Sequence, residues 1–301
     1  MDIRSLIKQR VPEDWTESPI TVTCYQVYAV MDSFNIGKTW KLLDIICLFA
    51  KGSYMFPMTF KTMTQEKQLG FSSRTEFQQS PKSLWMFIVR SGAEHQGDPD
   101  IEKRIRGFFY IIAGRNIAYE KFFTFTINPD DTQSFYSDSF LNPNAFPMID
   151  MAKIERKLDL ISPLLTEKAE LEPEIEIGLS WYAEALESSG IDAFLKIWVA
   201  FEALSMSDTN VRSSYELISQ IYDLDINLVG ETLLLGRIHG YRSAILHGKN
   251  RGKFSIEILK YFEYLVGDIV IFKIFEQKSQ TALEYMKRNN RNIVNVLLET
   301  P

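Results

Sequence analysis

The chain has 301 residues, which is long enough for two domains of ordinary size. Hydrophobic residues make up 46% of the sequence and charged residues 24%, a composition that excludes a wholly disordered chain. The formal net charge of −6 excludes a global positive field for nucleic acid, so a nucleic-acid-binding role would require a local basic patch.

The cysteines and the apolar segments exclude further classes of protein. Cys24 and Cys47 are too few for a disulfide framework, and no Cys-x-x-Cys pair is present to hold zinc. The most apolar stretch, residues 258–275, contains four charged residues, whereas a membrane span requires about 20 largely uncharged ones. Charges also interrupt the apolar residues at the start of the sequence, which predicts no signal peptide. We therefore expect a cytoplasmic protein without a membrane span.

The first 150 residues predict a mixed domain with a bias toward β structure. Three stretches rich in β-branched and aromatic residues are predicted strands: Thr21–Val30, Leu84–Val89 and Phe122–Ile127. Residues 40–49 and 101–112 are short apolar runs that could be helices, but periodicity alone does not separate helix from strand in such runs, so both alternatives stay open. A loop-like segment, residues 142–147, precedes the expected boundary, which gives domains of 1–150 and 151–301.

Helical periodicity takes over after this boundary, and no strand pattern follows. Ile191, Leu195, Trp198 and Phe201 share one helical face, and Gly190 stands before them as a break. A second apolar stripe runs through residues 258–270, and residues 215–222 and 231–246 are also predicted helices. The expected fold is α+β: a β-biased mixed N-terminal domain of unknown role, followed by an all-α helical bundle.

One stretch of the acidic chain has a local positive charge. Residues 232–256 contain no Asp or Glu but carry five cations and two of the three histidines. The cations are Arg237, Arg242, Lys249, Arg251 and Lys253, and the histidines are His239 and His247. Phosphate binding needs only a few such contacts, so we predict a phosphate-binding surface here. The alternative for residues 249–253 is that they only complement the negative end of a helix dipole.

Two segments of the C-terminal half carry a resemblance to a known family. Phe194-Leu-Lys-Ile-Trp-Val-Ala-Phe-Glu-Ala-Leu204 is followed about 40 residues later by Tyr241-Arg-Ser-Ala-Ile-Leu-His-Gly248. Together they resemble the HEPN superfamily, specifically its ApeA-like branch, over about residues 171–280. The resemblance implies an all-α bundle that forms a homodimer in which both Arg-x4-His motifs meet. It also implies RNA cleavage without a metal or cofactor, often in antiviral or toxin-like defence.

The residues of this motif suit such chemistry. Attack of the ribose 2′-hydroxyl on the phosphate needs a proton acceptor, a proton donor and a group that stabilises the transition-state charge. His247 can exchange protons near neutral pH, and the fork of Arg242 matches phosphate oxygens. Ser243 lies one helical turn before His247 and could orient the imidazole or touch phosphate. The family more often has Asn, Asp or His at that position, which puts turnover in doubt.

Two features of the motif leave a structural interpretation open. Five residues on an ideal helix turn through about 500°, so Arg242 and His247 would point about 140° apart on one chain. They converge only where the helix loosens at Gly248 or where a second copy completes the site. Glu202 matches a recurrent acidic position of the family, and a Glu202–Arg242 pair would explain both residues structurally.

Two hypotheses follow from the sequence. The first is a regulated ribonuclease of HEPN type that uses Arg242, Ser243 and His247, with Arg237, His239, Lys249, Arg251 and Lys253 as RNA-binding residues and a partner or ligand bound to the N-terminal domain. The second is a non-catalytic HEPN-fold module that forms dimers and binds nucleotide or nucleic acid within a larger complex.

Overall fold

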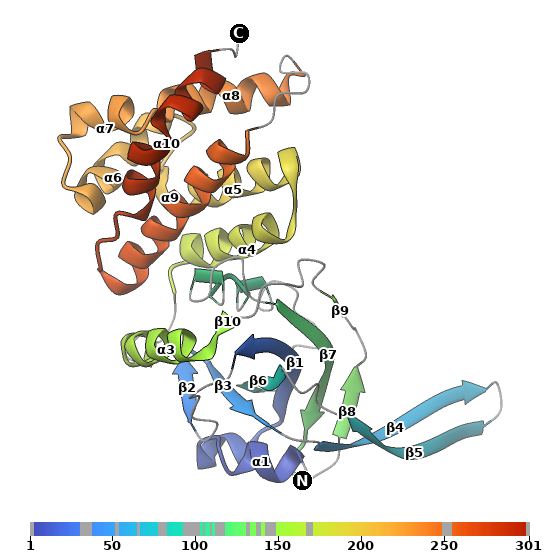
Figure 1. Ribbon diagram of the computed structural model, residues 1–301. Coiled ribbons are helices and arrows are strands. Elements are labelled where there is room, and N and C mark those ends of the chain that lie inside the picture. Colours follow the sequence, from blue (N-terminus) through green and yellow to red (C-terminus); the bar gives the residue numbers. More distant parts are fainter. Residues whose placement is uncertain are drawn as a thin grey trace. The chain divides into compact units, whose positions relative to one another are not determined.

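The computed structural model gives an α+β fold in which an antiparallel sheet region precedes an all-helical region, as the sequence predicted (Figure 1). It describes residues 3–30, 38–51, 54–64, 67–77, 83–92, 103–104, 106–108, 110–111, 118–130, 133–136, 140–141, 149–166, 171–248 and 255–298. No strand follows residue 150 within these ranges.

The main sheet has the strand order β2-β3-β6-β1-β7-β8. Its strands are β1 (Ile20–Val30), β2 (Thr39–Leu42), β3 (Ile45–Ala50), β6 (Ser83–Ser91), β7 (Ala118–Ile127) and β8 (Gln133–Tyr136). Two short strands join it, because β9 (Phe140–Leu141) pairs with β7 and β10 (Ile149–Asp150) runs parallel to β1. A separate hairpin, β4 (Tyr54–Thr64) with β5 (Lys67–Phe77), makes a second, two-stranded sheet.

The three strands predicted from sequence are confirmed, and they are neighbours in the sheet. Residues 21–30, 84–89 and 122–127 lie in β1, β6 and β7, with β1 paired antiparallel to both of the others. Residues 40–49, which the sequence left open between helix and strand, form the β2–β3 hairpin. Its turn contains Leu43 at a φ of 60°, and leucine is not one of the residues usually found in turns. All six residues of β3 are buried. Burial on both faces removes the alternation that would have indicated a strand.

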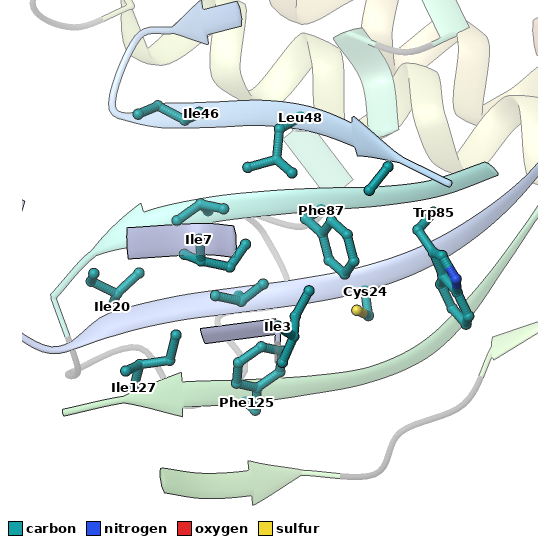
Figure 2. Packing of buried hydrophobic residues seen from close by; sticks show 13 residues of the cluster. Ile3, Ile7, Ile20, Cys24, Ile46, Leu48, Trp85, Phe87, Phe125 and Ile127 are labelled. Carbon is teal, nitrogen blue, oxygen red and sulfur yellow. The ribbon is translucent and has the colours of Figure 1, made fainter. Parts of the chain in front are cut away.

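The core of the sheet region is entirely apolar and takes alternate residues from four adjacent strands (Figure 2). From β1, β3, β6 and β7 come Ile20, Val22, Cys24, Ile46, Leu48, Ala50, Trp85, Phe87, Val89, Phe125 and Ile127. Helix α1 (Ile3–Lys8) covers this face and adds Ile3 and Ile7, which are both fully buried. Burial raises the pKa of the Cys24 thiol, so Cys24 acts here as a small apolar residue.

The chain divides into two compact units whose boundary differs from the predicted one. Residues 1–97 and 112–170 form the first unit, and residues 98–111 and 171–301 form the second. The helix α3 (Met151–Thr166) belongs to the first unit, where it packs against β2. The indole Nε1 of Trp40 donates a hydrogen bond to Asp159 at 2.8 Å, and the Ser162 hydroxyl donates to the Lys41 carbonyl at 2.7 Å.

The segment 103–111, which the sequence left open between helix and strand, is helical at its described residues and belongs to the helical unit. Cations on this segment pair with the carboxylates of α4 (Pro173–Glu187). Lys103 Nζ lies 2.6 Å from Glu184, and Arg106 Nε lies 2.9 Å from Glu187 with both side chains mostly buried. A short stretch of the N-terminal half is therefore built into the C-terminal unit.

The helical unit is organised around α9 (Ile256–Phe275), which contacts α4, α5 (Gly190–Ser205), α6 (Tyr215–Tyr222) and α10 (Thr281–Leu298) (Figure 1). Ser255 caps the start of α9 by accepting a hydrogen bond from the Ile258 N–H. Asp268 on α9 is 1% exposed and accepts hydrogen bonds from the Tyr222 hydroxyl and the Ala282 N–H. A buried carboxylate thus fixes the first turn of α10.

Three further helices of this unit surround and carry the Arg242–His247 motif. They are the short helix η3 (Val211–Ser214), α7 (Ile226–Thr232) and α8 (Leu235–Leu246), and the motif lies at the end of α8. The single helix predicted for residues 231–246 is broken, because Leu234 adopts a left-handed φ of 54° between α7 and α8. Leucine gives no sequence signal for such a break.

Candidate functional site on helix α8

The buried face of α8 fixes this helix within the unit. Its buried residues are Leu235, Ile238, Tyr241 and Ala244. The ring of Tyr241 contacts that of Phe194 on α5 at 5.4 Å, and its hydroxyl accepts a hydrogen bond from the Ser255 N–H at 3.2 Å. Burial raises the pKa of the Tyr241 phenol, so this group stays neutral and has a structural role. The apolar spacing thereby decides which α8 side chains face outward.

Arg242 is held against α5 by two side chains. Its guanidinium carbon lies 5.9 Å from the centre of the Trp198 ring, and its Nη2 lies 3.5 Å from a carboxylate oxygen of Glu202. The indole N–H of Trp198 donates to the same oxygen at 2.6 Å, which orients Glu202 toward Arg242. The Nε of Arg242 is buried and makes no hydrogen bond to a described residue. The structure thus brings Glu202 and Arg242 together and leaves one guanidinium donor unused.

His239 lies beside Arg242 on the same side of α8. Its imidazole is 5.7 Å from the Trp198 ring, at an angle of 34°, and the residue is half-buried. Arg237 is exposed on another side of the helix. Trp198 therefore touches both His239 and Arg242, and it organises this end of the candidate site.

His247 has a different environment, because it stands where α8 ends. It is exposed, it caps the helix, and its N–H donates to the Ser243 carbonyl at 3.1 Å. Gly248 follows with a φ of +66°, a conformation that glycine adopts without strain. Ser243 is half-buried and lies one turn before His247, as the spacing predicted.

One face of α8 carries two exposed glycines and Ser243 ahead of His247. Gly236, Gly240, Ser243 and His247 fall within about 60° of one another around an ideal helix. A Cβ atom added to Gly236 or Gly240 would meet no atom within 4 Å, so this face is open in one copy of the chain. His239, at the edge of the face, is one turn from Ser243.

Part of the predicted basic strip lies outside the described residues. Lys249, Arg251 and Lys253 fall in the undescribed residues 249–254. His95, the third histidine of the chain and not part of the strip, also lies outside the described ranges. Of the five cations, the structure describes Arg237 and Arg242.

Comparison with known proteins adds nothing to this description. No protein-family model, curated protein or solved structure matches the chain. Among the described residues, no group of three or more His, Cys, Asp and Glu side chains is arranged to hold a metal ion. No described helix combines the length and the apolar composition that crossing a membrane requires.

Trp198 is the site residue that sequence reasoning missed. The apolar stripe Ile191–Leu195–Trp198–Phe201 placed it in the core, where it is indeed fully buried. Its hydrogen bond to Glu202 spans four residues, one helical turn, and this spacing was the available signal. A buried indole must find an acceptor for its N–H, so a carboxylate one turn away marks a polar end of the core.

Proposed function

We propose that the helical unit is a metal-independent endoribonuclease of HEPN type, with Arg242 and His247 as its catalytic residues. The observation that carries this proposal is the environment of Arg242. Its guanidinium is oriented by Trp198 and Glu202 while the Arg242 side chain remains 26% exposed, and His247 on the same helix is open to solvent. A fixed cation and an accessible imidazole are the two groups that metal-free RNA cleavage needs.

The proposed reaction is an internal phosphoryl transfer. The ribose 2′-oxygen forms a bond to phosphorus while the bond to the 5′-oxygen breaks, which leaves a 2′,3′-cyclic phosphate and a 5′-hydroxyl. One His247 takes the proton of the 2′-hydroxyl, and a second His247 returns a proton to the leaving 5′-oxygen. Arg242 stabilises the charge that accumulates on the phosphate oxygens, and Ser243 orients an imidazole or touches phosphate.

The need for two histidines makes a homodimer part of the proposal. On one regular helix Arg242 and His247 point about 140° apart, so one copy does not bring them to the same phosphate. The open face of Gly236, Gly240 and Ser243 allows the α8 helix of a second copy to approach closely. A pair of α8 helices facing each other would bring two copies of each catalytic residue to one groove.

We further propose that the activity is controlled and cytoplasmic, in a defence role. A constantly active ribonuclease is toxic, so a partner or ligand bound by the N-terminal sheet unit is the expected control. Cys24 and Cys47 are both free and buried, which suits a reducing compartment. Arg237 and His239, with Lys249, Arg251 and Lys253, would contribute to RNA binding.

The test is RNA degradation by the full chain in the presence of EDTA, compared with His247→Ala and Arg242→Ala. We expect each variant to lose at least about 100-fold in rate while remaining dimeric, and the wild-type products to carry 2′,3′-cyclic phosphate ends. His95→Ala is the matched histidine control and should retain full activity. Equal cleavage by His247→Ala, or products that carry 5′-phosphates, would overturn the mechanism.

The pairing of Arg242 with Glu202 also favours a second candidate function. An arginine that is occupied by a carboxylate and an indole could serve only to join α8 to α5. In that case the unit is a non-catalytic dimerisation and nucleic-acid-binding module. Purified wild-type protein would then bind RNA and leave it intact, and Arg242→Ala would lower the stability of the unit.

A further inference from the structure

A cavity outside the α8 motif lies where η3, the start of α6 and α7 meet. It has a volume of about 530 Å³ and is lined by Arg212, Tyr215, Ile226, Asn227, Gly230 and Glu231. This volume falls within the roughly 300–1,000 Å³ typical of pockets for small ligands. Four of the lining residues are exposed, so the cavity opens to solvent.

Tyr215 and Gly230 shape the inside of this cavity. A Cβ atom at Gly230 would lie 2.3 Å from the Tyr215 hydroxyl, so the phenol rests directly on the backbone of α7. Only glycine allows that close approach. The contact with α7 therefore fixes the position of the Tyr215 ring at the cavity.

The polar groups that line the cavity differ in character between the elements that supply them. Arg212, from η3, supplies a cation that makes no ion pair with any described residue. Glu231, from α7, supplies an exposed carboxylate that is likewise without an ion pair among the described residues. The Asn227 amide nitrogen donates to Asp225 at 3.0 Å, which leaves the amide oxygen of Asn227 as an acceptor. The cavity therefore offers a cation from one element and two acceptors from another.

We propose that this cavity binds a single guanine nucleotide, with its phosphate on Arg212 and its base against Tyr215. The Watson–Crick edge of guanine presents two neighbouring N–H donors, which suit the acceptors Glu231 and Asn227, whereas the other bases present fewer donors there. An aromatic ring provides a surface on which the base stacks, and an arginine fork matches phosphate oxygens.

This inference deepens the proposed ribonuclease function and rests on it for the source of the ligand. Both η3 and α7 contact α8, so the cavity is built on two elements that pack against the helix that carries Arg242 and His247. The guanine would then belong to single-stranded RNA, and its binding would set a sequence preference for cleavage. The same chemistry also describes a free guanine nucleotide, which the experiment distinguishes.

The test is calorimetric titration of the full-length protein with GMP, AMP, CMP and UMP. We expect GMP to bind at least about tenfold more tightly than the other three. Arg212→Ala should weaken GMP binding at least about tenfold while leaving guanosine binding nearly unchanged, because it removes only the phosphate contact. Glu231→Gln should abolish the preference for GMP over AMP. Arg288→Ala, an exposed arginine on α10, is the matched control and should bind GMP as the wild type does.

A second titration separates the two sources of the nucleotide. Uridine hexamers with and without one central guanosine are compared with GMP, using His247→Ala so that no RNA is cut. Tighter binding of the hexamer with guanosine than of GMP assigns the cavity to RNA, whereas tighter binding of GMP assigns it to a free nucleotide. The inference is overturned if the four mononucleotides bind alike, or if Arg212→Ala and Glu231→Gln bind GMP as the wild type does.

Failure of this inference is distinguishable from failure of the proposed function. If the wild type binds GMP selectively but degrades no RNA, the cavity stands and the ribonuclease proposal falls. If the wild type degrades RNA but binds the four mononucleotides alike, the ribonuclease proposal stands and the cavity assignment falls.

Discussion

The two ends of the candidate motif on helix α8, Arg242 and His247, are held in opposite ways. Toward the middle of the helix, Arg242 contacts the ring of Trp198 and the carboxylate of Glu202. At the C-terminal end, His247 is exposed beside Gly248, and its backbone N–H donates a hydrogen bond to the Ser243 carbonyl. We call these the held end and the free end.

The difference separates what each residue contributes to the protein. A substitution at the held end should change the stability of the fold as well as any activity, whereas a substitution at the free end should leave the stability almost unchanged. A proposed active site with this arrangement has its charge-stabilising group fixed in advance and its proton-transfer group accessible. The loss of unfolding free energy caused by a substitution should therefore be largest at the held end and smallest at the free end.

The largest loss is expected for Trp198→Ala, which removes the centre of the held end. Trp198 is fully buried, and its ring packs on Phe201 at 5.4 Å and on Phe262 at 5.0 Å. Loss of a buried tryptophan costs about 3–5 kcal/mol, so unfolding in urea should shift to much lower denaturant. Trp198→Phe keeps an aromatic ring but removes the N–H donor to Glu202, and it should cost less than half as much. Equal losses for the two variants would mean that ring packing contributes little here.

Arg242→Ala should have the next largest effect on stability, about 1–2 kcal/mol. The substitution removes a contact with an indole, an ion pair and the packing of the aliphatic part of the side chain. The pair is only partly exposed, at 26% for Arg242 and 33% for Glu202, so salt screens it incompletely. Arg242→Lys retains the charge and should recover part of the loss. An unchanged urea midpoint for Arg242→Ala would show that the held end does not stabilise the unit.

The sequence predicted the pairing at the held end but not the residue that arranges it. Glu202 and Arg242 were matched from their positions in the two segments, and the structure brings them to 3.5 Å. Trp198 fits an apolar stripe equally well, so periodicity alone does not reveal its hydrogen bond. The predicted apolar face of α5 also differs slightly from the observed one. Ile191 is 42% exposed, whereas Phe194 and Ile197 are buried.

The same limits explain where the fold prediction was wrong or left open. Strands β1, β6 and β7 were predictable because their residues favour β structure and lie near the centre of the sheet. The β2–β3 hairpin and the break before α8 both turn at a leucine with positive φ, namely Leu43 and Leu234. Tertiary packing decides such positions, and no local residue type indicates them.

Glu202→Gln should reduce stability by only about 0.5–1 kcal/mol, because it removes the charge but keeps an acceptor. The amide oxygen of glutamine can still accept the hydrogen bond from Trp198, while the attraction to Arg242 is lost. Raising the salt concentration should reduce the difference in unfolding free energy between Glu202→Gln and the wild type, because salt screens the ion pair. A loss as large as that of Trp198→Ala would mean that the carboxylate charge, rather than the indole, organises the held end.

His247→Ala should have the smallest effect on stability, less than about 0.5 kcal/mol, because the side chain is exposed and the helix-ending conformation needs only the backbone and Gly248. Its unfolding curve in urea should overlay that of the wild type over the range in which Arg242→Ala is already unfolded. Gly248→Ala is the informative partner, since it strains the positive φ of +66° without altering the imidazole. If His247→Ala were destabilised as much as Gly248→Ala, His247 would belong to the folded framework, and loss of cleavage by this variant would no longer indicate a role in proton transfer.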